Sequence, residues 1–299
     1  MRLVSAGNAI VDLTIDIPAL PEKGGDVLGR STGTAPGGSV NTMVAAVRQG
    51  LPTAYAGAHG TGPFGDRVRA VLAAEGVEVL QPPTLGQDSG YDIALTEPDG
   101  ERTFVTVFGA EAKLTSEALA GIRLGAGDLV HVSGYGLLGS TNGEAIAGWL
   151  GTVDAGHVVL VDPGPLVSDI PPGVWGVAEA RADWISCNLR EARAMTGEPD
   201  AAAAAEKLAR RGNVVVRLGA DGCLIGTAGE VSHVPGFPVT VVDTNGAGDA
   251  HAGAFLAALA RGADPIAAAR AANACAAIAV TRPGPGTAPT LDEVRRLLE

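Results

Sequence analysis

Two carboxylates flank a turn of small residues in the stretch Asp243-Thr244-Asn245-Gly246-Ala247-Gly248-Asp249. Residues 251–259 are apolar at helical spacing, so the turn is predicted to open a helix. The first amides of a helix lack partners within the helix, and small residues let an anion approach them. A carboxylate there, Asp249, suits a base that takes a proton from a hydroxyl attacking a phosphate. The alternative is an aspartate that caps an ordinary helix.

A second candidate site combines paired glycines with an asparagine. Gly37 and Gly38 form a turn before a predicted helix at about 40–49. Such glycines give a hinge or let a ligand touch the backbone, and Asn41 can hold a hydroxyl. The alternative is a plain glycine-rich turn. Asp12, just past the first predicted strand, reads on its own as a turn residue.

A third pair, Asn188 and Glu191, places an amide and a carboxylate one turn apart at a predicted helix start. It suits either a hydrated Mg²⁺ near phosphates or a helix cap. A Walker-type loop is excluded because no lysine follows a glycine and precedes Ser or Thr. Any bound phosphate must therefore be held by backbone amides, which favours the 246–249 turn.

A competing hypothesis is a dinucleotide site. Gly134 to Gly139 fits G-x-G-x-x-G between a predicted strand and a helix, and Asp162 ends the following strand. The match at Gly60 to Gly65 lacks a following acidic residue. With 43 glycines in the chain, both matches are weak signals.

The elements that must position these residues alternate between strand and helix. Predicted strands at 129–133, 158–162, 184–186 and 214–218 are separated by helices, which indicates a mostly parallel sheet covered on both faces. Val239 to Val242 is predicted as a strand before the 243–249 turn. Segments 13–36 and 88–108 are β-rich and predict a separate small sheet, with a hairpin turn at Glu97-Pro98-Asp99-Gly100.

Composition narrows the class of protein. A formal net charge of −12 over 299 residues argues against nucleic-acid or anionic-membrane partners. No apolar run reaches membrane-spanning length and no signal peptide is recognisable. Three widely spaced cysteines, Cys187, Cys223 and Cys275, indicate reduced thiols and a cytoplasmic protein.

The candidate motifs together resemble those of the ribokinase-like (PfkB) family of carbohydrate and nucleoside kinases. The resemblance covers nearly the whole chain in the family's order. Residues 243–249 resemble the specific D-T-x-G-A-G-D signature, and residues 37–41 resemble the N-terminal one. The remaining matches are the N-x-x-E motif at 188–191, the nucleotide-side strand end at 218–222, and the adenine-flanking segment at Asn273 and 281–284.

That resemblance implies roles for the phosphoryl-transfer residues. Asp249 would be the base, and the amides of Gly246, Ala247 and Gly248 would form the anion hole for the γ-phosphoryl group of ATP. Asn188 and Glu191 would organise Mg²⁺ through water. Gly219, Gly222 and Asn273 would lie on the nucleotide side.

The resemblance also implies an acceptor site and a lid. Asp12, Gly37, Gly38 and Asn41 would hold sugar hydroxyls, and Asp243 with carbonyls near 245 and 280–286 could hold K⁺. The β-rich segments would form a lid, inserted in one kinase domain over 1–299, that closes over substrate and forms a homodimer. Arg102, on a lid strand, could meet a charged or bulky acceptor, although an exposed surface arginine is the alternative.

Three departures from the family pattern argue against a strict ribokinase. Ile10 stands where ribose-specific members carry Asn, Gly60-Thr61-Gly62 replaces G-D-D, and His251 replaces a usual Phe. We therefore predict an ATP-dependent kinase acting on a hydroxyl of a small sugar or sugar derivative. The alternatives are a nucleoside kinase of the same family, an NAD-dependent dehydrogenase using Gly134 to Gly139, and a non-catalytic sugar-binding protein.

Overall fold

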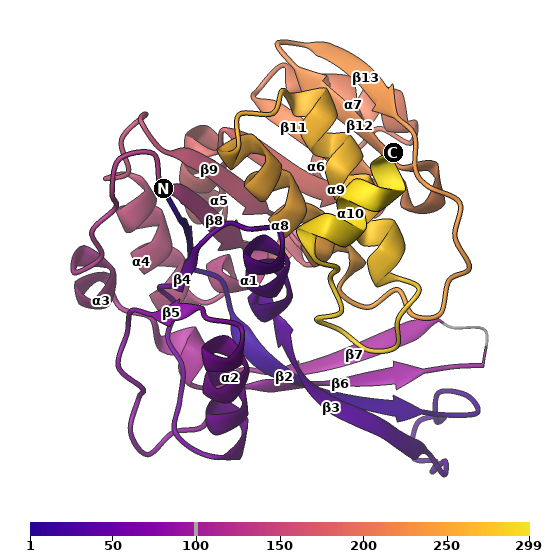
Figure 1. Ribbon diagram of the computed structural model, residues 1–299. Coiled ribbons are helices and arrows are strands. Elements are labelled where there is room, and N and C mark those ends of the chain that lie inside the picture. The colour runs from indigo at the N-terminus through magenta and orange to yellow at the C-terminus, as the bar shows by residue number, and fades with distance from the viewer. Residues whose placement is uncertain (99–100) are drawn as a thin grey trace.

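A computed structural model describes residues 1–98 and 101–299 and contains one large, mostly parallel sheet (Figure 1). Neighbouring strands from β5 to β11 run parallel, and β12 and β13 are added antiparallel at one edge. Apolar runs such as Val214-Val215-Val216 are buried on both faces, as parallel strands require. In spatial order the strands are β13 (Glu230–Val234), β12 (Cys223–Thr227), β11 (Asn213–Arg217), β10 (Trp184–Asn188), β9 (Val158–Asp162), β8 (Leu129–Ser133), β1 (Leu3–Ser5), β4 (Thr53–Tyr55) and β5 (Glu78–Val79).

Helices cover both faces of this sheet because successive strand residues point to opposite sides. Leu3 packs with the helices of one face, and its neighbour Val4 packs with those of the other. The first face carries α1 (Ser39–Arg48), α8 (Ala247–Ala260), α9 (Pro265–Ala279) and α10 (Leu291–Leu298). Elsewhere lie α2 (Pro63–Ala74), α3 (Ser116–Ala120), α4 (Ser140–Leu150), α5 (Pro172–Arg181), α6 (Leu189–Thr196) and α7 (Ala201–Ala209), with 3₁₀ turns η1 (Ala110–Lys113), η2 (Gly134–Leu137), η3 (Val167–Asp169) and η4 (Gly219–Asp221).

A second, four-stranded sheet extends from the main body below α8 and α9 (Figure 1). Its spatial order is β3 (Arg30–Gly38), β2 (Ala9–Asp16), β6 (Tyr91–Thr96) and β7 (Arg102–Val107). β2 pairs antiparallel with β3 and parallel with β6, and a register shift falls between Thr14 and Ile15. The predicted fold class, a mostly parallel sheet with a separate small β-sheet, is confirmed.

The observed structure differs from the predicted elements in two segments, 239–242 and 37–38. The strand predicted at 239–242 is wrong: the segment pairs with no strand of the described chain, and its one ladder-like contact is Val242 N to Val280 O at 2.7 Å. Val241 and Val242 are exposed there, so β-branched residues alone do not make a strand without a neighbour. The turn predicted at Gly37 and Gly38 is instead the end of β3, which runs directly into α1. Of the predicted hairpin turn, Asp99 and Gly100 lie outside the described residues, while β6 and β7 pair antiparallel.

None of the helices in the described ranges is long and apolar enough to cross a membrane.

Candidate active site

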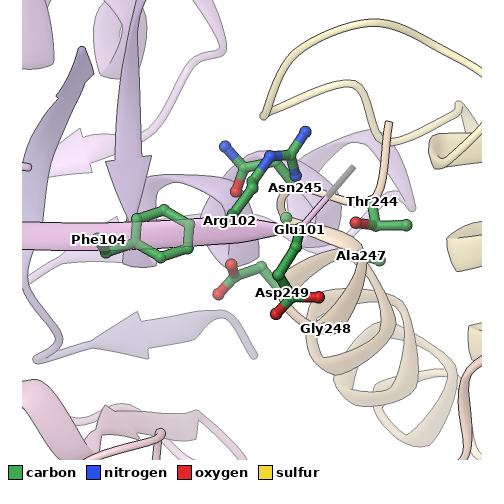
Figure 2. A pocket seen from close by; sticks show the side chains of 9 residues that line it. Glu101, Arg102, Phe104, Thr244, Asn245, Ala247, Gly248 and Asp249 are labelled. Carbon is green, nitrogen blue, oxygen red and sulfur yellow. The ribbon is translucent and has the colours of Figure 1, made fainter. Parts of the chain in front are cut away.

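A pocket of about 300 Å³ lies between the small sheet and the start of α8. Figure 2 shows Arg102 and Phe104 of β7 on one side and the loop entering α8 on the other. The carboxyl ends of β9, β10 and β11 reach the same region, because parallel strands end at one edge of their sheet. Two stretches far apart in sequence, 101–104 and 244–249, therefore line the pocket.

Backbone geometry at the start of α8 fits an anion site. Gly246 has φ 74°, a left-handed conformation that favours glycine, and it is the N-cap residue of α8. Ala247 N donates to Thr244 O at 3.3 Å, whereas the amides of Gly246 and Gly248 have no hydrogen-bond partner within the described chain. Two amides at the positive end of a 14-residue helix are thus available to an anion.

Asp249 is placed beside those amides as a group that can exchange a proton. It lies inside α8 rather than at its cap, which rules out the capping alternative. Thr42 Oγ1 donates to Asp249 Oδ1 at 2.8 Å. Burial and the charge of Asp162 raise the pKa of Asp249 to about 7, against hydrogen bonds from Thr42 and Asn41 and the charge of Arg217. A carboxyl with a pKa near neutrality is matched to general base chemistry.

The first glycine pair encloses a buried carboxylate. Asp12 is 3% exposed, and Asn245 donates Nδ2 to its Oδ2 at 3.3 Å. A Cβ at Gly37 would lie 1.7 Å from Asp12 Oδ1, and one at Gly38 would lie 2.5 Å from Asn8 O. Only glycine leaves room at either position, and Gly38 also has φ 60°. Asp12, read alone as a turn residue, is instead a buried strand residue.

Asn41 approaches the same pocket from the first turn of α1. Its Oδ1 is buried without a hydrogen-bond partner in the described chain. A Cβ at Gly246 would lie 3.3 Å from Asn41 Nδ2, so the asparagine lies against the anion-binding turn. Asn41 therefore lies beside both Gly246 and Asp249.

Asn188 and Glu191 form a capping box at the start of α6. Asn188 Oδ1 accepts from Glu191 N at 2.9 Å, and Asn188 N and Nδ2 each donate to a Glu191 carboxylate oxygen at 2.7 Å. Burial and Asp162 raise the pKa of Glu191, against the charge of Arg217. The helix-cap alternative is thus realised, and it fixes a buried carboxylate near the pocket.

Arg217 is a residue that the sequence did not single out. Its Nη1 donates to Asp162 Oδ2 at 3.1 Å and to Ser186 Oγ at 2.6 Å, and its Nη2 lies 3.6 Å from Glu191 Oε2. A Cβ at Gly248 would lie 3.4 Å from its guanidinium. A buried cation therefore lies beneath the anion-binding turn and balances the acidic groups around it.

Arg102 and Asp243 form an ion pair between the small sheet and the loop before α8. The alternative of an exposed surface arginine at Arg102 is wrong, because both side chains are only 18% exposed. Asp243 Oδ1 accepts from Asn245 N at 2.8 Å, and its Oδ2 accepts from Gly284 N at 3.0 Å. Although burial raises the pKa of Asp243, these bonds and the Arg102 charge lower it overall. Asp243 thus joins the 243–246 turn to the loop near Gly284.

The residues expected on the nucleotide side lie near the end of β11. Gly219 and Gly222 have φ 64° and 88°, and a Cβ at Gly222 would lie 2.2 Å from Val234 O. Asn273 is buried and donates Nδ2 to Val234 O and Pro235 O at 3.0 and 3.1 Å. Asn273 Oδ1 therefore faces His251 Nε2 at 3.1 Å, which assigns the ring proton to Nε2. Burial and Arg217 lower the pKa of His251 to about 3, so it is a neutral core residue.

Three other residues near the pocket were missed from sequence: Thr42, Tyr135 and Asp92. Thr42 follows Asn41 in the first turn of α1, a position that could have suggested proximity. Tyr135 and Asp92 carry no sequence signal, because only the register and the packing of η2 bring them near Asp249.

The dinucleotide motif at 134–139 is closed by the chain itself. A Cβ at Gly134 would lie 1.8 Å from Pro163 O. The Asp162 carboxylate already accepts from Gly164 N at 3.0 Å and from Arg217. Gly134 therefore serves close backbone packing rather than a pyrophosphate.

Comparison with known proteins assigns the chain. The pfkB family carbohydrate kinase profile matches residues 2–291. The uncharacterized sugar kinase YegV of Escherichia coli (strain K12) is 33% identical over 295 residues, covering 96% of this chain and 91% of YegV. The ATP-dependent ribose-1-phosphate kinase of Halopiger xanaduensis is 32% identical over 310 residues, covering 100% of this chain and 98% of that kinase. The crystal structure of aminoimidazole riboside kinase from Salmonella enterica, with aminoimidazole riboside and an ATP analog, has a TM-score of 0.80 at 28% identity over the full length of both chains. This chain belongs to the pfkB family of carbohydrate kinases.

Proposed function

We propose that this kinase transfers the γ-phosphoryl group of ATP to a hydroxyl of a small sugar or sugar derivative. The observation that carries the proposal is Asp249, a half-buried pocket carboxyl with a pKa of about 7 beside two unpaired amides. Asp12 and Asn41 each keep a buried oxygen without a partner in the described chain, which supports a hydroxyl-bearing acceptor. A nucleoside, which also offers a sugar hydroxyl, is the second candidate acceptor.

In the proposed mechanism the acceptor hydroxyl lies between Asp249 and the anion-binding turn. Asp249 accepts the proton of the hydroxyl as its oxygen attacks phosphorus in line with the leaving group. The amides of Gly246 and Gly248 donate to the charge that develops on the phosphoryl oxygens. The Ala247 amide, which donates to Thr244 O at 3.3 Å, would join them by exchanging that partner. The nucleotide side is shaped by Gly219, Gly222 and Asn273. Asn273 acts indirectly, through the backbone carbonyls of Val234 and Pro235 to which it donates.

Mg²⁺ would be held through water near Asn188 and Glu191. No three acidic, histidine or cysteine side chains of the described chain are grouped so as to ligate a metal directly. Mg²⁺ commonly keeps its waters and binds one or two carboxylates plus phosphates, so the buried Glu191 carboxylate fits that mode. Bound there, Mg²⁺ would neutralise phosphate charge.

A monovalent cation such as K⁺ is proposed at Asp243 and the carbonyls of 280–286. Arg102 already binds the Asp243 carboxylate, so K⁺ would bind beside it or replace it. Rates in potassium chloride that exceed those in tetramethylammonium chloride would support the ion site. Equal rates would indicate that Arg102 supplies the positive charge.

The small sheet is proposed as a lid over the acceptor. Gly37, Gly38 and Arg102 lie on its strands, and the Arg102–Asp243 pair ties it to the loop before α8. The outer face of the same sheet exposes Val105 and Val107 of its edge strand β7, which supports a homodimer formed through the lid.

The experiment is the variant Asp249→Asn, assayed with a panel of sugars and nucleosides. General base catalysis is worth about 10²–10⁴-fold, so kcat should fall by that factor. Affinity for a non-hydrolysable ATP analogue, measured by calorimetry, should stay within about twofold. A variant with wild-type kcat would reject Asp249 as the base. A wild-type protein that binds sugars but transfers no phosphate would instead favour a non-catalytic sugar-binding protein.

A further inference from the structure

Two aspartates lie side by side on the face of the small sheet that is turned toward α8. The parallel strands β2 and β6 pair Asp12 with Asp92 in register. Residues paired in this way point to the same face of a sheet, on strands about 4.8 Å apart. The hydrogen bond from Asn245 to Asp12 identifies that face as the one over the active site.

Each of these carboxylates keeps one buried oxygen without a partner in the described chain. The two atoms are Asp12 Oδ1 and Asp92 Oδ1. Buried polar atoms are nearly always hydrogen-bonded, and leaving one unpaired is costly. Burial raises the pKa of both groups, and the charge of Asp92 raises that of Asp12 further. Two donors from a bound molecule would satisfy both oxygens.

The surroundings of the pair disfavour an anion. Burial and the charges of Asp92 and Asp249 raise the pKa of Tyr135 to about 12, which places its phenol among the acidic groups. Arg102 is the cation that acts on Asp12, and its guanidinium is already bound to Asp243. A phosphate or carboxylate in this position would be repelled by the carboxylates of Asp12 and Asp92. Arg102 would not offset that repulsion, because it is already paired with Asp243.

We propose that Asp92 is a specificity-determining residue of this kinase. With Asp12 it binds two neighbouring hydroxyls of an uncharged sugar, or of the sugar of a nucleoside, and it excludes acceptors that carry phosphate or carboxylate. The inference rests on the proposed function. It predicts that this chain uses a different class of acceptor from its relative from H. xanaduensis, whose name gives a sugar phosphate as the acceptor.

The test compares matched acceptors at pH 7.5: D-ribose with D-ribose 1-phosphate and 5-phosphate, D-fructose with D-fructose 1-phosphate, and uridine with uridine 5′-monophosphate. Wild type should favour the uncharged member by at least about 100-fold in kcat/KM. In Asp92→Asn, which keeps the shape but removes the charge, kcat/KM for the uncharged acceptor should fall about 10- to 100-fold. The preference over the phosphorylated partner should shrink at least about tenfold, and KM for ATP should not change.

Asp16→Asn is the matched control, because Asp16 lies on the same strand β2 but is exposed and paired with Arg30. It should leave both the rates and the preference unchanged. A phosphate-bearing sugar as the best wild-type acceptor, or an unchanged preference in Asp92→Asn, would overturn the inference while leaving the kinase function intact. Calorimetry without ATP tests the opposite outcome, in which the acceptor selectivity holds but the kinase function does not. Binding of the uncharged sugars alone, with no transfer, would support Asp92 selectivity and reject the proposed function.

Discussion

The chemistry of single residues in this protein is set by their immediate neighbours. Asp249 receives opposing influences: burial and Asp162 raise its pKa, while the hydroxyl of Thr42 and the charge of Arg217 lower it. The balance puts the pKa at about 7. A carboxyl must be ionised to accept a proton, so kcat should fall as pH drops below about 7 and reach a plateau above it.

The variant Thr42→Val tests this balance, because it keeps the side-chain shape but removes the donor to Asp249 Oδ1. The hydrogen bond stabilises the ionised form, so its loss should raise the pKa of Asp249. A bond to a charged group is worth about 1.5–3 kcal/mol, which shifts the acid limb of kcat upward by on the order of one pH unit. Thr152→Val, which removes a remote hydroxyl bonded to Trp149 O, is the control. Identical acid limbs in all three proteins would contradict the role of Thr42.

At the scale of elements, the active site depends on how closely α1 and α8 cross. Gly253 lies one turn after Asp249, and a Cβ there would be 2.4 Å from Thr42 O and 2.7 Å from Ala45 Cβ. The glycine thus lets the two helices approach until Thr42 reaches Asp249. The helix boundaries of α6, α9 and α10 could be predicted from sequence, since caps and apolar spacing are local. The crossing could not, because it depends on which faces of two remote helices meet.

Gly253→Ala should therefore force the helices apart, although alanine is the better helix former. Overpacking costs about 1–3 kcal/mol, so the melting temperature should fall by about 2–4 °C or more. The rate should fall too, since Thr42 and Asn41 move away from Asp249. Gly148→Ala is the matched control: this helical glycine of α4 is exposed with nothing within 4 Å of an added Cβ, so stability should hold or rise. Equal melting temperatures for the two variants would refute the close crossing.

For the whole molecule, the small sheet combines an edge strand, β7, with an apolar outer face. Val105 is 51% exposed on β7 and pairs in register with Ile93 of β6, so both lie on the outer face. Exposed apolar strand edges are a template for pairing with another chain. The acidic inner face and the apolar outer face give the sheet two different surfaces, one proposed to bind the acceptor and one proposed to bind a second copy.

We predict that the wild-type protein is a dimer and that Val105→Asp converts it to a monomer. Burying an unpaired charge in an apolar interface is too costly for the dimer to persist. Light scattering on a sizing column at micromolar concentration measures the change. Val177→Asp is the control, since Val177 is an exposed valine on α5 of the main sheet. A wild-type protein that elutes as a monomer would contradict assembly through the lid.

The amino-acid sequence alone determined the turn of small residues at 243–249, the order of the family motifs along the chain and the two-sheet class of fold. These features depend on local spacing: small residues before a helix, apolar residues every three or four positions, and glycines at turns. The tertiary structure decided which distant side chains meet. Thr42 with Asp249, Arg102 with Asp243 and Asp12 with Asp92 are each joined by strand register or helix crossing. Register and crossing follow from the simultaneous packing of all elements around a common core, and no local pattern of residues encodes them.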